Sequence, residues 1–260
     1  MNHISVTILT RNEASLIGDC LESLQGIADE IIVVDSFSDD DTVKICRDHG
    51  CKVIQRQFNG YGTLRQYATS LTTHNYVLSV DADEVISSEL KQSILKLKQE
   101  GFAHRVYSIR RQNFFCGIPV KRCGWHPDDN IRLFNKRYAN WNLRDIKEQV
   151  IFPDSLRPEP IKGQLLHYRC TSQQELDATE DRHAGLKSHI IAANNIHISP
   201  LTPILKGIGA YLSTYLRHGG IFEGKIGRKI SGRNFRSEIM AYRLARRILK
   251  RRAEKEISQK

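Results

Sequence analysis

The sequence lacks a long hydrophobic run, a paired-cysteine motif and an export signal. A membrane-spanning helix needs about 20 apolar residues, whereas the longest candidate stretch, 207–216, is bracketed by Lys206 and Arg217. The six cysteines form no CxxC pair and no zinc spacing, which is typical of reduced, mostly buried thiols in a cytoplasmic protein. The opening residues, 1–9, have neither the core nor the cleavage site of a signal peptide. We therefore expect a cytoplasmic protein that is not integral to the membrane.

Two nucleotide-binding motifs are also missing. The sequence contains no GxGxxG and no GxxxxGK[ST], which argues against a dinucleotide oxidoreductase and a P-loop NTPase. A sugar nucleotidyltransferase would need a glycine-rich phosphate loop after its first strand, and none follows the apolar run 4–9.

Positive charge is concentrated at the end of the chain. From Arg217 onward, fourteen basic residues face four acidic ones, a net charge of +10 that equals that of the whole chain. The range 235–255 combines basic residues with apolar ones near helical spacing, a pattern typical of a helix that lies on a membrane surface. An anionic leaflet contributes about 1 kcal/mol per basic residue. A solvated helix packed on the body remains an alternative, while nucleic acid is disfavoured because aromatic residues are sparse and no reading module is present.

The first half of the sequence alternates strands and helices. Continuous apolar runs with helical crossovers predict parallel strands covered on both faces, a doubly wound α/β sheet that binds ligands at the carboxyl ends of its strands. The predicted strands are 4–9, 30–35, 51–55, 75–80 and 106–111. The predicted helices are 13–24, 40–49, 61–71, 87–99, one opening near 172, and 235–255. The range 113–141 is typical of sheet edge and loop.

Acidic residues follow the fourth predicted strand as Asp81-Ala82-Asp83-Glu84. Two carboxylates two residues apart at a strand end can share Mg²⁺ or Mn²⁺, and such a cation can bind a diphosphate and stabilise its leaving charge. The alternative is an acidic turn that caps the next helix.

Polar groups also follow the first two strands, as Thr10-Arg11-Asn12-Glu13 and as Asp35 with the acidic run 39–41. A carboxylate at Asp35 can accept a hydrogen bond from a base or ribose, whereas Asp40 or Asp41 is expected to cap the next helix.

These three segments together resemble glycosyltransferase family 2. The resemblance rests on Ile-Leu-Thr-Arg-Asn-Glu (8–13), Ile-Ile-Val-Val-Asp-Ser-Phe-Ser-Asp-Asp (31–40) and Val-Asp-Ala-Asp-Glu (80–84). Further segments, 60–62, 65–68, 124–128 and 132–134, are similar to the branch that contains lipopolysaccharide core glycosyltransferases, especially those adding a β-linked glucose to an inner-core heptose. The resemblance implies a GT-A fold. It implies a nucleotide-sugar half at 1–112 and an acceptor half at 113–170, followed by a basic helical extension at 171–260.

The resemblance also implies roles for individual residues. The residues implied in nucleotide-sugar binding are Thr10, Glu13, Asp35, Arg65 and Asp81, and Asp83 and Asp81 are implied as metal ligands, with Asp83 the direct one. The family inverts configuration, so a carboxylate must deprotonate the acceptor hydroxyl from about 3 Å. The matching triplet is Ile146-Lys147-Glu148, with lysine where the branch has histidine. Glu148 is thus the implied base, and its alternative role is an exposed strand glutamate paired with Lys147 or Arg144.

The expected acceptor or sugar contacts are Trp125, His126, Asp128 and Arg132. Trp125 could stack on a sugar or be ordinary core. His167 and His183 are interpreted as structural or surface residues, because neither has a second histidine at ligand spacing. Arg110, Arg111, Lys121, Arg122 and Arg132 could bind phosphates on an anionic acceptor or form solvated strand edges.

The sequence thus predicts a metal-dependent, inverting transfer of a hexose, with UDP-glucose as the expected donor. The expected acceptor is a lipid-linked saccharide such as lipopolysaccharide core, at the inner face of the cytoplasmic membrane. Two alternatives remain: the same chemistry on a capsule or other surface polysaccharide, and a catalytically inactive, nucleic-acid-associated binding protein.

Overall fold

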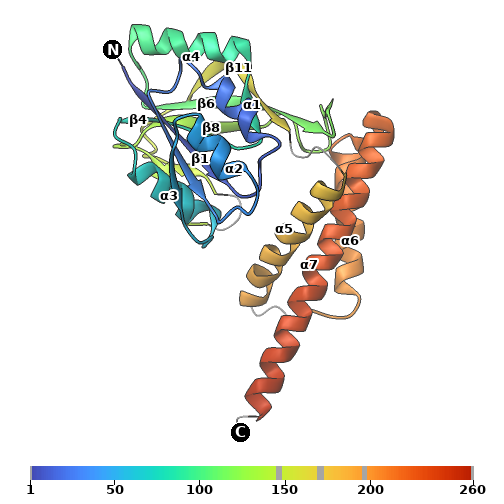
Figure 1. Cartoon of the computed structure of the whole chain (residues 1–260). Helices are drawn as coiled ribbons and strands as arrows, with labels where there is room; N and C mark the ends of the chain where they lie inside the picture. Colours follow the sequence, from blue (N-terminus) through green and yellow to red (C-terminus); the bar gives the residue numbers. More distant parts are fainter. Residues whose placement is uncertain (1, 145–147, 169–172, 195–197, 259–260) are drawn as a thin grey trace. The chain divides into compact units, whose positions relative to one another are not determined.

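The computed structural model describes residues 2–144, 148–168, 173–194 and 198–258 (Figure 1). The chain divides into two compact units. The first unit comprises 1–117 and 127–169, and the helical unit comprises 118–126 and 170–260. Each unit is described by itself.

The first unit is built on one mixed sheet with strand order β3-β2-β1-β4-β8-β6-β11-β5. Its strands are β1 (Ile4–Thr10), β2 (Glu30–Asp35), β3 (Lys52–Gln55), β4 (Tyr76–Asp81), β5 (Glu84–Ile86), β6 (Val106–Phe115), β8 (Asp129–Asn135) and β11 (Glu159–Tyr168). The pairs β2–β3, β1–β2, β1–β4 and β6–β11 are parallel, whereas β8 runs antiparallel to β4 and β6. β5 also runs antiparallel to its partner, β11. The expected parallel-dominated α/β sheet is therefore confirmed.

Side-chain alternation along the strands gives the sheet two covered faces. On one face, Val6, Ile8 and Leu78 pack in a single cluster with α1 (Ile17–Ser23), α2 (Thr42–Asp48) and α4 (Ser88–Glu100). On the other face, Val34 packs against α3 (Tyr61–Ser70). Val77 on this face packs with Trp141 and Val150, from the small antiparallel pair β9 (Asn140–Trp141) and β10 (Val150–Ile151). Helices on both faces make this the doubly wound architecture that the sequence pattern predicts.

The predicted helix positions of the first unit hold, with shorter ends for α1 and α2. Ser87 caps α4, as its Oγ accepts a hydrogen bond from the Leu90 backbone N–H at 3.3 Å. The expectation of sheet edge and loop over 113–141 is wrong for β8, which lies between β4 and β6 with residues 132–135 buried. This strand contains polar residues inside the site described below, so its apolar pattern is interrupted.

The helical unit contains α5 (Gln173–Ala193), α6 (Thr202–Leu212) and α7 (Gly224–Ser258). A π-helical turn, η1 (Ser213–Arg217), and a 3₁₀ turn, η2 (Gly220–Glu223), join α6 to α7, and β7 (Ile118–Pro119) belongs to the same unit. Small residues let α7 approach its neighbours closely. Ala241 and Ala245 pack against Ala184 and Ala192 of α5, and a Cβ on Gly207 of α6 would lie 2.8 Å from Ile239. Among the described helices, none is long and apolar enough to cross a membrane.

Candidate active site at the carboxyl edge of the sheet

Strand register brings three of the predicted segments to one edge of the sheet. Thr10 at the end of β1 pairs with Asp35 at the end of β2, and Leu9 pairs with Asp81 at the end of β4 on the other side. Because the three strands are parallel, the loops that follow them leave the sheet together.

Asp81 is held by arginines from two different elements. Arg65 Nη2 of α3 donates to Asp81 Oδ1 at 2.6 Å, and Arg132 Nη2 of β8 donates to Asp81 Oδ2 at 2.9 Å. Arg111 Nη1 lies 4.0 Å from the same Oδ2. Burial alone would raise the pKa of the Asp81 carboxyl, but the charges of Arg132, Arg65 and Arg111 outweigh it and hold this pKa well below its usual range.

Arg65 joins Asp81 to the candidate base. Its Nε donates to Glu148 Oε1 at 3.1 Å and its Nη1 donates to Ser79 Oγ at 3.2 Å. The guanidinium lies over the Trp141 ring, 4.7 Å from the centroid, and the side chain is buried. A single rigid fork therefore fixes the distance between the carboxylate after β4 and Glu148. Glu148 has a defined partner in the site, while Ile146 and Lys147 lie outside the described residues.

Glu84 is the fully buried carboxylate of this network. It is fully buried and accepts hydrogen bonds from Arg132 Nη2 at 2.8 Å, Arg111 Nη1 at 3.3 Å and the Asp81 backbone N–H at 2.9 Å. A buried carboxylate needs this level of compensation. No separate role was predicted for Glu84, although it stands in the acidic segment that follows β4.

Asp83 lies beside a histidine that the sequence pattern did not assign to the site. His167 Nε2, at the end of β11, is 3.0 Å from Asp83 Oδ2. The Asn113 amide donates its Nδ2 hydrogen to Asp128 Oδ2 at 2.9 Å, so its Oδ1 accepts from His167 Nδ1–H at 2.6 Å. With Nδ1 protonated, the lone pair of a neutral imidazole is on Nε2, the atom that faces the carboxylate.

The side-chain atoms that Asp83 and His167 bring together can bind a divalent cation. His167 Nε2 and Asp83 Oδ2 lie 3.0 Å apart, and two such electron-rich atoms repel each other unless a proton or a cation lies between them. A histidine that binds a metal commonly donates its other ring N–H to a carbonyl oxygen. A cavity of about 100 Å³ opens beside Asp83, lined also by Asp19 and Tyr168. Within the described residues no cluster of three or more such ligands occurs. The two oxygens of Asp81 already accept from arginines, so its metal role stays a prediction.

The nucleotide-side residues lie at the ends of β1 and β2. Asp35 is buried and accepts from the Ser38 backbone N–H at 3.0 Å and from Gln55 Nε2 at 3.1 Å. Asp40 accepts from the Thr42 backbone N–H at 3.0 Å, so it serves the start of α2 as expected. Thr10 Oγ1 is buried and has no hydrogen-bond partner in the described part of the chain. Glu13, just beyond, donates its backbone N–H to Thr42 Oγ1 at 2.8 Å.

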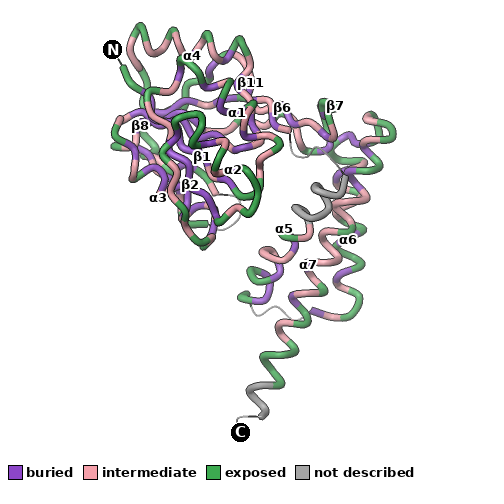
Figure 2. The backbone as a smooth tube through the Cα atoms, in the orientation of Figure 1, coloured by how far each residue is buried: buried purple, intermediate pink, exposed green. Residues whose placement is uncertain are grey.

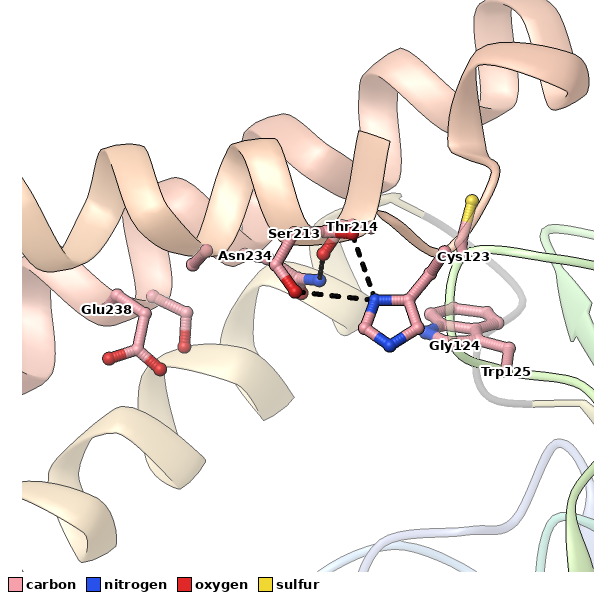
Figure 3. A pocket seen from close by; sticks show the side chains of 10 residues that line it. Cys123, Gly124, Trp125, Ser213, Thr214, Asn234 and Glu238 are labelled. Atoms are coloured by element: carbon pink, nitrogen blue, oxygen red, sulfur yellow. Dashed lines mark hydrogen bonds between the residues drawn. The ribbon is translucent and has the colours of Figure 1, made fainter. Parts of the chain in front are cut away.

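The predicted acceptor residues separate between the two units. Asp128 belongs to the first unit, where it accepts from Arg111 Nε at 2.7 Å. Burial would raise the pKa of Asp128, but Arg111 and hydrogen bonds from Asn113 lower it. Trp125 and His126 belong to the helical unit. There Trp125 lines a polar cleft of about 430 Å³ with residues of η1 and α7 such as Asn234 (Figure 3).

The other candidate phosphate ligands differ in surroundings. Arg110 is an exposed strand residue whose Nε donates to Asp129 at 2.9 Å, whereas Arg111 belongs to the buried network. Arg122 lies over the Phe222 ring in the helical unit, 4.8 Å from its centroid.

Comparison with known proteins agrees with this geometry. Residues 5–152 match the family described as glycosyl transferase family 2. This chain belongs to that family. The match contains the ends of β1, β2 and β4 together with Glu148, and with it the GT-A fold expected from the sequence is confirmed.

Several relatives are known. The chain is 35% identical over 185 residues to an uncharacterized glycosyltransferase of Rickettsia typhi, covering 68% of this chain and 63% of that one. It is 24% identical over 195 residues to the lipopolysaccharide core biosynthesis glycosyltransferase LpsC of Rhizobium meliloti, covering 71% and 70%. The glucosyl-3-phosphoglycerate synthase of Mycobacterium tuberculosis, solved with Mn²⁺ and UDP, covers 44% of each chain at 23% identity and a TM-score of 0.35, too distant a likeness to bear on function. The chain spans about half to two thirds of the length of the Rickettsia relatives.

Proposed function

We propose that this family 2 member is an inverting glycosyltransferase that moves a hexose, glucose from UDP-glucose in the first instance, to a lipid-linked saccharide. The observation that carries the proposal is the single guanidinium of Arg65, which bonds both Asp81 and Glu148. Transfer needs a donor-side anchor and a base at a fixed separation, and this fork supplies that separation.

The donor would lie along the ends of β1, β2 and β4. The Asp35 carboxylate would accept hydrogen bonds from ribose or base. Thr10 Oγ1, which has no partner among the described residues, would form a hydrogen bond with the same ligand, with Glu13 near them. Arg65 and Asp81 would border the diphosphate and ribose. These assignments agree with the strand register, which places Thr10 beside Asp35.

Asp83, assisted by His167, would hold Mg²⁺ or Mn²⁺ next to the diphosphate. When bound, such a cation offsets the negative charge that develops on the leaving diphosphate. Asn113 would keep His167 in the tautomer that presents Nε2, and Asp128 would keep the Asn113 amide oriented.

Glu148 would act as the general base. An acceptor hydroxyl oxygen attacks the anomeric carbon from the face opposite the diphosphate, the bond from that carbon to the diphosphate oxygen breaks, and the hydroxyl proton moves to the Glu148 carboxylate. One attack on one face inverts configuration. Arg65 would orient the carboxylate through its bond to Oε1 while leaving the rest of the group for the acceptor.

The acceptor is proposed from the branch resemblance and from the printed function of LpsC. A lipopolysaccharide core saccharide is the first choice, and a capsule or other surface polysaccharide is the second. Asp128 would contribute from the first unit, and Trp125 and His126 stay predicted sugar contacts of the helical unit. Association with the inner face of the cytoplasmic membrane, through the basic tail, completes the proposal.

A donor screen tests the function. Purified protein is incubated with Mn²⁺ and a panel of nucleoside diphosphate sugars, and release of the nucleoside diphosphate is measured; UDP-glucose should be hydrolysed fastest. Glu148→Gln should keep donor affinity but lose about 10²- to 10⁴-fold in transfer rate to an added acceptor. The matched control is Glu100→Gln, at an exposed carboxylate that pairs with Lys96. No hydrolysis of any donor would refute the enzyme assignment, and unchanged transfer by Glu148→Gln would remove Glu148 as the base.

A further inference from the structure

The helical unit has an exposed apolar face on α6 and η1. Six large aliphatic side chains lie exposed within 201–216: Leu201, Ile204, Leu205, Ile208, Leu212 and Leu216. Leu205 is 66% exposed and Leu216 is 56% exposed. Their spacings of three and four residues place them on one side of a helix.

The opposite side of α6 is the side that packs. Pro203, Gly207 and Thr214 are buried, and Gly207 lies against Phe235 and Ile239 of α7. The helix is therefore apolar on two sides, one that packs inside the unit and one open to solvent. The burial colours along α6 in Figure 2 mark both exposed and buried residues. A contiguous exposed apolar face of this kind marks an interaction surface.

The apolar side of α7 is not available for the same purpose. Tyr242, Ile248 and Leu249 are half-buried against the cluster that joins α7 to α5. These are residues on which the expected membrane contact of the basic helix depends. Inside the folded unit α7 can offer charge to a membrane, but its apolar side chains are largely committed to packing.

The charged residues within the α6 segment are all basic. No acidic residue occurs from 190 to 222. Lys206 and Arg217 are exposed on the same segment, and Lys225, Arg228 and Lys229 are exposed at the start of α7. An apolar stripe with a cationic border is the pattern of a helix that lies in the interface of an anionic bilayer. Two copies joined through this face would bring their like-charged borders together.

We propose that the α6 face, residues 201–216, docks into the boundary between headgroups and acyl chains of an anionic lipid bilayer. The leucines and isoleucines enter the boundary, and the basic residues of α6 and α7 bind lipid phosphates. This surface belongs to the helical unit, whereas Asp81, Asp83 and Glu148 belong to the first unit, and the inference does not depend on the glycosyl-transfer proposal. It refines the expected basic-tail association by assigning the apolar contact to α6.

Vesicle binding by the full chain tests the proposal. Wild-type protein should cosediment with vesicles of phosphatidylglycerol and phosphatidylcholine. The double variant Leu205→Gln/Leu212→Gln should lose at least about tenfold in partition coefficient, because two leucine side chains no longer add apolar area to the contact with the bilayer. The matched control is Ile151→Gln in the first unit, where the replaced side chain is 57% exposed; its partitioning should equal that of wild type. Donor hydrolysis in lipid-free buffer should be unchanged in the double variant, which shows that the first unit is intact.

Depth-dependent quenching gives a second readout. Leu205→Trp fluorescence should be quenched by lipids brominated in their acyl chains, and Ile151→Trp fluorescence should not be. Wild-type partitioning by Leu205→Gln/Leu212→Gln would overturn the proposal. It would also be overturned if this variant bound vesicles normally but changed a lipid-free dimer into a monomer in sedimentation, since the occupant would then be a second copy.

Discussion

Arg65→Lys should uncouple Glu148 from the donor-side carboxylate without unfolding the site. The guanidinium bonds Asp81 through Nη2 at 2.6 Å and Glu148 through Nε at 3.1 Å. An ammonium keeps the charge but not the fork, so it can serve one carboxylate well and not both. We expect it to stay with the more tightly bound Asp81.

The magnitude follows from the bond that is lost. A hydrogen bond between charged groups contributes about 1.5–3 kcal/mol, and both side chains are largely shielded from water here. Loss of the Glu148 bond therefore predicts a fall in kcat of about 10- to 150-fold. KM for the donor should change little, because Asp81 still pairs with a positively charged side chain in this variant.

A double-mutant cycle is the assay. Steady-state transfer is measured for Arg65→Lys, Glu148→Gln and the combined variant. If Arg65 acts by positioning Glu148, the combined variant should be hardly slower than Glu148→Gln alone. Additive losses in kcat, or a wild-type kcat for Arg65→Lys, would refute this reasoning.

Three further predictions concern the surrounding network. Arg132→Met should lower the free energy of unfolding by about 3–5 kcal/mol, as measured by urea denaturation, because it leaves the buried Glu84 short of a partner. The pKa of Asp81 is depressed in the folded state, so its stabilising contribution is complete above the unfolded pKa of about 3.9 and is lost as pH falls through the lower folded value. In Arg132→Met the acid-induced loss of stability should therefore begin at a higher pH than in wild type. Identical onsets in the two proteins would contradict the assigned ion pairs. Gly62→Ala should displace the segment before Glu148, because the added Cβ would lie 2.2 Å from the Asn142 carbonyl oxygen. We expect kcat to fall by roughly 10²-fold as a result. Gly18→Ala is the control and should keep wild-type kcat, because no atom lies within 4 Å of the added Cβ.

Local sequence pattern was sufficient for the nucleotide-side half of the first unit. β1, β2 and β4 are buried on both faces, so they appear as continuous apolar runs, and the polar residue that ends each run had to lie at one edge of the sheet. Thr10, Asp35 and Asp81 were placed correctly for that reason.

Long-range pairing explains what local pattern did not reveal. His167 reaches Asp83 because β11 pairs with β5, which places His167 opposite Glu84. His167 and Asp83 are 84 positions apart in the sequence, so local pattern does not connect them. Arg132 was expected to contact acceptor, but in the structure it donates to Asp81 and Glu84, which only the interior position of β8 makes possible. α6 is absent from the predicted helices, although Pro203 lies in its first turn, where proline is tolerated.

Asp83 and His167 are proposed to hold the cation that binds the donor diphosphate. Isothermal titration of the full chain with UDP-glucose, with and without Mn²⁺, tests it directly in wild type, Asp83→Ala and His167→Ala. The account predicts Mn²⁺-dependent binding in wild type, loss of that dependence in Asp83→Ala, and weakened Mn²⁺ affinity in His167→Ala. Equal donor affinity with and without Mn²⁺ in all three proteins would contradict it.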